Sequence, residues 1–183
     1  MRILKAAALA LAVSVVPAMA DEVEDVLTGA IAAYQDGDIK LAREEIEYAL
    51  TLLKKAEAVG LVGFLPLALD GWTRTIEEGE NAMAMFGGGI SATGNYATDG
   101  GEFTLTLLAN SPLVTSMAAM FSSVTTMSAM GEIRRIGREK FLITDGQVQG
   151  LINKTVMVQV EGDDVDAIFA HLKTMDIAGL RDF

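Results

Sequence analysis

The chain has 183 residues, with 14 basic and 25 acidic side chains, a formal net charge of −11 at pH 7, and no cysteine. So acidic a surface repels nucleic acid and anionic lipid, which excludes a nucleic-acid partner. The lack of cysteine excludes disulfides, thiolate metal ligands and a cysteine nucleophile, so stability must come from an ordinary hydrophobic core.

Residues 1–20 have the order of a secretory signal. Arg2 and Lys5 precede an uncharged apolar run over residues 6–16, and small residues follow in Ala18-Met19-Ala20. Cleavage after Ala20 is the natural prediction. The run is shorter than the roughly 20 residues that span a bilayer, so we expect a periplasmic chain with no integral membrane span after signal cleavage. The cleaved chain would keep 12 basic and 25 acidic residues, a formal charge of −13.

Residues 21–65 are predicted to form a helical hairpin. Asp36-Gly37-Asp38 interrupts the helical pattern, with glycine for the turn and Asp38 as an acceptor for the first amides of a second helix. Two helices joined by so short a turn must lie antiparallel. Apolar residues recur every three or four positions in both helices, as one face each: Val23, Val26, Leu27, Ala30, Ile31 and Tyr34, then Ile39, Ala42, Ile46, Ala49, Leu50, Leu53 and Ala56.

Residues 30–56 resemble a single tetratricopeptide-type hairpin. The resemblance rests on the Gly37-Asp38 turn followed by Ala42, Tyr48, Ala49 and Leu50. No second copy follows at a fixed period, and a solenoid needs about three repeats to bury a continuous core. We therefore expect one hairpin and not a repeat array.

Residues 66–183 are predicted to form a sheet domain, because β-branched and alternating residues dominate from Trp72 onward. Phe103, Leu105 and Leu107 alternate with polar residues, as expected of a half-buried strand in an antiparallel sheet. Asp99-Gly100 and Asp145-Gly146 are hairpin turn signals. The predicted strands are Trp72 to Glu77, Ser91 to Thr98, Glu102 to Leu108, Glu132 to Thr144, and Gln147 to Val160 with a break near Asn153.

Two helices are predicted among these strands. One begins at Ser111-Pro112 and presents Leu113, Met117, Met120, Phe121 and Val124 on one face. The other begins at Asp163-Asp164 and carries the stripe Val165, Ile168, Phe169, Leu172 and Met175. The predicted fold class is therefore α+β, an N-terminal αα-hairpin plus a mainly antiparallel sheet covered by two helices.

Four stretches resemble, in this order, an uncharacterised family of secreted or periplasmic proteins of Gram-negative bacteria. They are "YQDGDIKLAREEIEYALTLL", "GWT", "MFGGGISATGNY" and "NSPLV". The resemblance covers most of the chain after the signal. It implies an exported helical hairpin joined to an α/β-sandwich and carries no catalytic motif.

The residues that usually carry catalysis or hold cofactors are sparse. The run "FGGGISATGNY" lacks the Gly-Lys-Ser/Thr of a phosphate-binding loop and the spacing of a dinucleotide site, so its glycines are expected to relieve crowding at a strand entrance. His171, the single histidine, is expected at the surface or boundary of its helix, and no G-x-S-x-G motif presents a serine. We predict no catalytic residue, no metal, no cofactor and no enzymatic activity.

Residues 110–131 contain no charge. Such a segment suits an internal helix over the sheet, and alternatively a partner surface or the wall of an apolar pocket. It also holds two M-x-x-M pairs, Met117 with Met120 and Met127 with Met130. Thioethers are soft ligands, so periplasmic Cu(I) binding is an alternative to their use as core fillers.

Four basic residues, Arg134, Arg135, Arg138 and Lys140, lie close together. They are expected on the solvated side of an edge strand, where positive charge discourages aggregation. A patch for an acidic partner or an anionic ligand is the alternative.

The function predicted from these features is that of a non-enzymatic binding or accessory module for another envelope protein. The outer face of the hairpin and the uncharged segment 110–131 are the surfaces expected to meet the partner. The alternative is a carrier of a small apolar, lipid-like ligand held between sheet and helix by Phe103, Leu105, Met117 and Phe121. The candidate binding residues are Trp72, Phe86, Phe103, Met117, Met120, Phe121, Arg134, Arg135 and Arg138.

Overall fold

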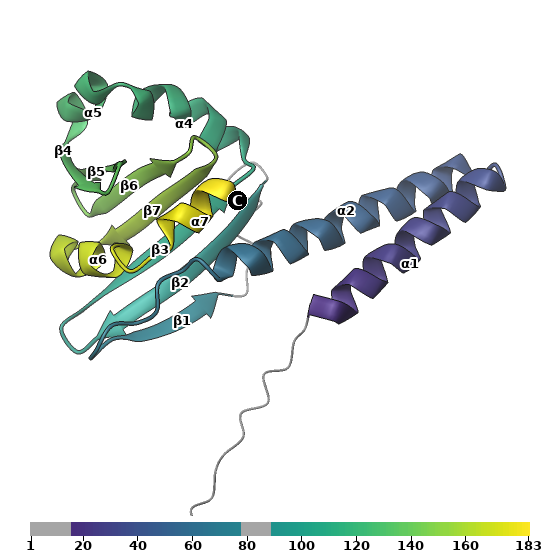
Figure 1. The fold of residues 1–183 in the computed structure, drawn as a ribbon, viewed down its shortest axis with the longest axis horizontal. Coiled ribbons are helices and arrows are strands. Elements are labelled where there is room, and N and C mark those ends of the chain that lie inside the picture. Colours follow the sequence, from purple (N-terminus) through teal and green to yellow (C-terminus); the bar gives the residue numbers. More distant parts are fainter. Residues whose placement is uncertain (1–15, 78–88) are drawn as a thin grey trace, which may run out of the picture. The chain divides into compact units, whose positions relative to one another are not determined.

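The computed structural model describes residues 16–77 and 89–183, with side chains described from residue 21. The chain divides into two compact units, Met1–Ala56 and Glu57–Phe183. Helix α2 begins in the first unit and ends in the second (Figure 1). The two units are described separately below.

The first unit is an antiparallel hairpin of α1 (Val16–Gln35) and α2 (Ile39–Val62). The turn has the predicted chemistry, because Gly37 has a φ of 83° and Asp38 Oδ1 accepts a hydrogen bond from the Leu41 amide at 3.0 Å. The predicted cleavage point after Ala20 lies within the range of α1. The side chains buried in the hairpin are small with one exception: Ala30, Ala33, Ala42, Ala49 and Leu52.

The second unit is built on one seven-stranded sheet in the order β1-β2-β3-β7-β6-β5-β4, and every neighbouring pair is antiparallel. The predicted α+β class with a mainly antiparallel sheet is confirmed. The strands are β1 (Thr73–Glu77), β2 (Ile90–Thr98), β3 (Gly101–Ala109), β4 (Glu132–Ile136), β5 (Glu139–Thr144), β6 (Gln147–Ile152) and β7 (Val156–Gly162).

Two of the predicted strands are hairpins in the structure. The stretch Glu132 to Thr144 turns at Gly137, whose φ of 58° is readily adopted by glycine, and so forms β4 and β5. The stretch Gln147 to Val160 turns at Asn153 and Lys154, both at positive φ, where the sequence predicted a break. A turn without an Asp-Gly or Asn-Gly signal was missed, because Gly137 is followed by Arg138.

In the described part of the second unit, four helices accompany the strands, where two were predicted. Ser123 ends α4 (Pro112–Ser122) and caps α5 (Val124–Met130), since its hydroxyl accepts from the Thr126 amide. The predicted C-terminal stripe runs past the end of α6 (Val165–Leu172) to Met175, and a further helix, α7 (Ile177–Asp182), follows it. Asp164 and Asp176 cap these two helices, each through a side-chain oxygen 2.9 Å from a backbone amide.

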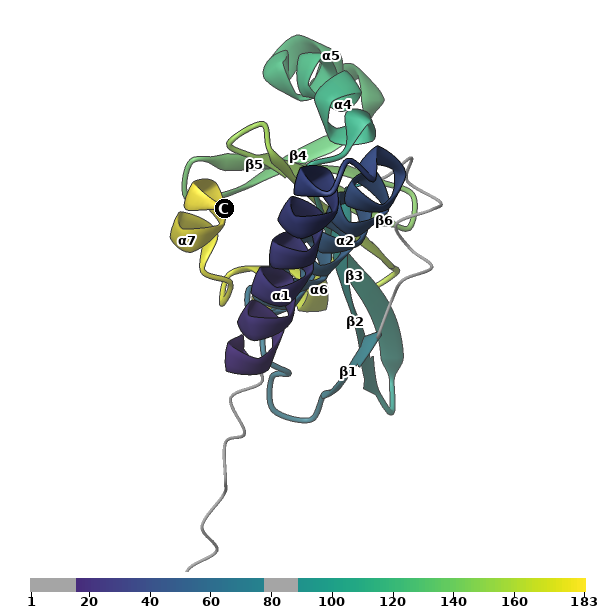
Figure 2. The same cartoon turned by 90° about the vertical axis from the view of Figure 1, so that its right-hand side faces the viewer.

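The sheet has a different set of neighbours on each face. One face packs with α6, α7 and the end of α2 in the main core, which includes Leu61, Leu105, Val158, Ile168 and Leu180. On the other face, Leu108, Met157 and Leu142 pack beneath α4 and α5. Figure 2 shows α4 and α5 together, apart from α6 and α7. Successive side chains along β3 and β7 therefore point to opposite faces of the sheet and pack into separate hydrophobic clusters.

The boundary between the units lies earlier than residue 65, the position predicted from the sequence. The structure divides the chain after Ala56. Leu61 and Leu65, which follow the boundary, are buried in the main core of the sheet unit. The last turns of α2 are therefore part of that core.

Candidate functional site

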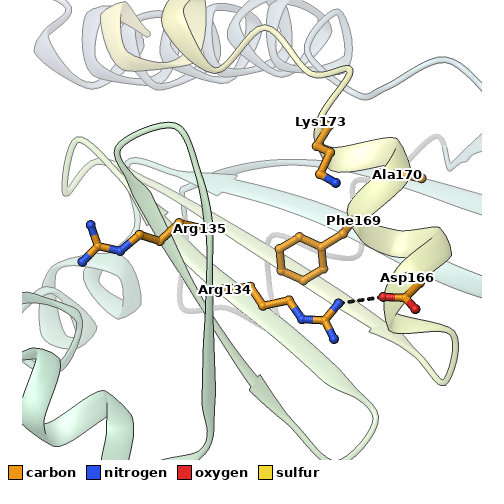
Figure 3. Close-up of a pocket in the computed structure, with 6 residues that line it drawn as sticks. All are labelled: Arg134, Arg135, Asp166, Phe169, Ala170 and Lys173. Atoms are coloured by element: carbon orange, nitrogen blue, oxygen red, sulfur yellow. Dashed lines mark hydrogen bonds and ion pairs between the residues drawn. The ribbon is translucent and has the colours of Figure 1, made fainter.

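A pocket of about 460 Å³ lies between the edge strand β4 and helix α6. It is lined by Arg134 and Arg135 from β4, by Asp166, Phe169 and Ala170 from α6, and by Lys173 just after that helix. Figure 3 shows Arg134, Phe169 and Asp166 close to one another, whereas Arg135 lies apart from them. Of the predicted basic residues, the structure therefore brings Arg134 and Arg135 to one pocket.

Arg134 is held in place by three contacts. Its Nε donates to Glu132 Oε1 at 2.9 Å, its Nη1 donates to Asp166 Oδ1 at 2.7 Å, and its guanidinium carbon lies 5.4 Å from the centre of the Phe169 ring. The hydrogen bonds to Glu132, and then to Asp166, raise the pKa of Arg134. These carboxylates largely satisfy its charge, so Arg134 primarily ties β4 to α6.

The basic cluster lies at the sheet edge, as the sequence predicted. β4 is the last strand in the sheet order, and Arg135 and Arg138 are exposed. Positive side chains at an open edge disfavour pairing with another strand. The cluster therefore has a structural use that does not depend on a ligand.

Trp72 and Phe103, two candidate binding residues, belong to an aromatic cluster inside the sheet unit. Phe103 stacks on Tyr96 with ring centres 4.6 Å apart, and Trp72 lies 5.2 Å from Phe103. The fourth ring is His171, whose centre lies 5.1 Å from Trp72 and 5.0 Å from Phe103. Phe103 is buried and Trp72 is half-buried, so these rings form a core contact.

The prediction that His171 lies at a surface or boundary was wrong, because its side chain is 0% exposed. Nε2 accepts from the Leu69 amide at 3.3 Å, and Nδ1 lies 2.9 Å from the Ala167 carbonyl oxygen. Since a carbonyl can only accept, Nδ1 carries the hydrogen. Both ring nitrogens are thus used inside the protein, and His171 joins α6 to the loop before β1.

Tyr96 also anchors the segment between α2 and β1. Its hydroxyl donates to the Pro66 carbonyl at 2.6 Å, and Arg74 Nη1 donates to the carbonyls of Leu65 and Pro66 at 3.0 Å each. Burial raises the pKa of Tyr96 to about 12, against an opposing effect of the Arg74 charge. This network fixes the segment between α2 and β1.

The uncharged segment 110–131 covers the second face of the sheet. Phe121 and Met127 are buried with Leu142, and Met117 and Met120 are partly buried against them. The outer sides of α4 and α5 are exposed. No single helix in the described part of the chain is long and apolar enough to cross a membrane; α4 and α5 pass that test only as a pair bent by 96°.

The four residues predicted to line an apolar pocket do not meet. Phe103 and Leu105 belong to the main core, whereas Met117 and Phe121 pack on the opposite face of the sheet.

Phe86, another candidate, lies outside the described residues. Of the glycines near it, Gly89 has a φ of 106°, and a Cβ there would meet the Ala109 carbonyl oxygen at 2.6 Å. Glycine is needed at the start of β2 because it adopts this φ readily and has no Cβ to clash with the backbone of Ala109.

The outer face of the hairpin, predicted to meet a partner, is a candidate surface whose exposed residues the structure identifies. The predicted stripes of α1 and α2 mix two sets of residues: Ala30, Ala42 and Ala49 are buried between the helices, whereas most of the large apolar side chains are exposed. The exposed fractions of seven of them lie between 41% and 67%. These are Leu27, Ile31, Tyr34, Ile39, Ile46, Leu50 and Leu53. The alanines among these residues were the sequence signal for which side of each helix contacts the other, because small residues allow two helices to approach closely.

These seven residues, which we call the apolar flank, lie on one side of the hairpin. At 3.6 residues per turn, Leu27, Ile31 and Tyr34 share one side of α1, and Ile39, Ile46, Leu50 and Leu53 share one side of α2. The opposite side is marked by the Tyr48 hydroxyl, which donates to Glu22 Oε1 at 3.0 Å. Both apolar sets lie away from that bond, so they form one continuous surface.

A comparison with known protein families, with curated proteins and with solved structures found no match to this chain. Within the described residues, no group of three or more His, Asp or Glu side chains is placed to hold a metal ion. The hairpin and the pocket must therefore be interpreted from their own geometry.

Proposed function

We propose that this protein is an exported, non-enzymatic binding module of the bacterial envelope, and that its helical hairpin holds the protein partner. The signal-like N-terminus supports export, and the apolar flank supports protein binding. The observation that carries the proposal is the exposure of seven large apolar side chains on one side of a hairpin whose own contact uses mostly alanine. Contiguous exposed apolar surface of this kind is typical of interaction sites.

The shape of the surface favours a helical partner. The exposed residues of α1 are spaced by four and three positions, and those of α2 by seven, four and three. Two parallel rows at this spacing leave a groove between them that accepts an amphipathic helix or another hairpin. The rest of α2 is rich in charge, with exposed ion pairs of Lys40 with Glu44 and Arg43 with Glu47.

A photoreactive amino acid at position 31 or 50 tests this proposal in living cells. We expect a specific crosslinked protein band from both positions in the periplasmic fraction, with the bound chain identified by mass spectrometry. The same amino acid at Leu41, which is 43% exposed on the other side of α2, is the matched control. Equal crosslinking from positions 41 and 50, or none from either, would contradict the proposal.

The alternatives predicted from the sequence have less support. The pocket proposed for an apolar ligand is not lined as predicted, because Phe103 and Phe121 lie on opposite faces of the sheet. Cu(I) binding through the M-x-x-M pairs would need Met127, which is fully buried in a core, while Met130 is half-exposed. A Cu(I) titration without saturable binding would eliminate that alternative.

A further inference from the structure

We infer that the occupant of the apolar flank is a second copy of this chain, and that two hairpins pair into a four-helix bundle. This inference rests on the proposed function and names the partner of the same surface. Closed two-fold dimers are the commonest soluble oligomers, and their interfaces use the same surface on both subunits. The apolar flank meets that requirement because one hairpin supplies two rows of apolar residues, one from each helix.

The size of the surface fits a dimer. Its seven side chains are each about half exposed. At roughly 200 Å² for a large side chain, they present about 700 Å² in each copy. A stable protein interface buries about 800 Å² from each partner, so the apolar flank with its polar border is large enough.

Charge selects one arrangement of the two copies. The described part of α1 carries only acidic charges, and Glu24 lies along the outer border of the apolar flank. The corresponding border of α2 carries Arg43, which is paired with Glu47, and Lys54. Placing α1 of each copy over α2 of the other brings Glu24 toward Lys54, whereas placing α1 over α1 puts two acidic borders together.

The register of the hairpin brings individual charges together in this arrangement. Glu24 and Leu50 are equally far along the chain from Gly37 in the turn, so they lie at the same level of the hairpin. Lys54 is one helical turn beyond Leu50, within reach of Glu24 from the second copy. All neighbouring helices in the bundle are then antiparallel, as in common four-helix bundles.

The test is the mass of the exported chain purified from the periplasm, measured by analytical ultracentrifugation over a range of concentrations. We expect a dimer for the native chain. Leu50→Glu should raise the dimer dissociation constant about a hundredfold or more, because it buries a charge in an apolar interface. Leu41→Glu is the matched control on the opposite side of the same helix and should leave the dimer intact. Circular dichroism confirms that both variants remain helical.

A charge exchange tests the arrangement. Glu24→Lys and Lys54→Glu should each weaken the dimer, and the double variant should restore it. The inference is overturned by a native chain that stays monomeric, by equal effects of Leu50→Glu and Leu41→Glu, or by a double variant that fails to restore dimerisation. A monomer whose position 31 crosslinks to a different envelope protein overturns the second copy but keeps the proposed function. A monomer without any such crosslink overturns both.

Discussion

Tyr96 has its hydroxyl buried on the main-core side of the sheet, bonded to the Pro66 carbonyl. Its side chain also stacks on Phe103 and lies with its ring centre 5.2 Å from that of His171. The polar atoms of Tyr96 and His171 are therefore satisfied within the aromatic cluster, which can exclude water without leaving an unpaired donor or acceptor. The expectation that the single histidine lies at the surface or boundary of its helix fails here for that reason.

Tyr96 should give the protein a distinct alkaline transition. Burial raises its pKa to about 12 in the folded chain, from about 10 when unfolded. The stabilisation from the neutral phenol is complete below pH 10 and is lost as the pH rises toward 12, because the unfolded chain then releases a proton that the folded chain retains. Urea unfolding across this pH range measures the effect.

Tyr96→Phe separates this contribution from other alkaline effects. We expect it to cost about 1 kcal/mol at neutral pH through the lost hydrogen bond, and to flatten the fall in unfolding free energy above about pH 10. Tyr34→Phe, at an exposed position, is the control and should follow the native curve. Identical alkaline slopes for the native chain and Tyr96→Phe would show that burial of this phenol has no such role.

At the scale of elements, the pairing of β5 with β6 depends on Gly150, which has no side chain. Phe141 lies opposite Gly150, and a Cβ on that glycine would come within 2.5 Å of the Phe141 ring. The ring occupies the space above the glycine and reaches Phe169 of α6, 5.8 Å away. The strand pair and the helix are thus held by one aromatic side chain.

Gly150→Ala should therefore destabilise the sheet unit by about 1 to 3 kcal/mol, because the Phe141 ring must leave its position. Gly101→Ala is the matched control: it also lies in a strand, but a Cβ there meets no atom within 4 Å. We expect the control to change the unfolding free energy little. Chemical denaturation followed by the fluorescence of Trp72 compares the two, and equal losses would contradict the close-packing argument.

At the scale of the whole molecule, the three hydrophobic clusters draw all of their residues from the second unit. The sheet is also complete within that unit, since all seven strands pair with one another. Units with their own core can fold alone. The first unit contributes no residue to these clusters.

Residues 57–183 should fold without the hairpin. We expect this fragment to keep the near-ultraviolet circular dichroism of the buried aromatic cluster and to unfold cooperatively. It should also be monomeric, because it lacks the apolar flank. Sedimentation and thermal unfolding check both points, and a fragment without fixed aromatic signals would show that the second unit depends on residues before Glu57.

The local sequence pattern by itself determined the helical hairpin, the antiparallel character of the sheet and the positions of most strands. Asp38 and Gly37 could be assigned because a cap and a turn act within a few residues. The alternation of Phe103, Leu105 and Leu107 similarly reports one face of one strand. The turn at Gly137 was missed because it does not interrupt the hydrophobic pattern, and for the same reason the predicted C-terminal stripe ran past the end of α6 at Leu172.

Only the tertiary structure decided which surfaces are free. In the hairpin, Ala30 and Ile31 belong to one predicted stripe, yet the first is buried and the second is exposed, because close packing of two helices selects the small side chain. In the sheet unit, Phe103 and Phe121 are both apolar and buried, but Phe103 of β3 belongs to the main core, whereas Phe121 belongs to α4, which packs on the opposite face of the sheet. A sequence states which residues avoid water, and the packing of distant segments decides which of them another molecule can reach.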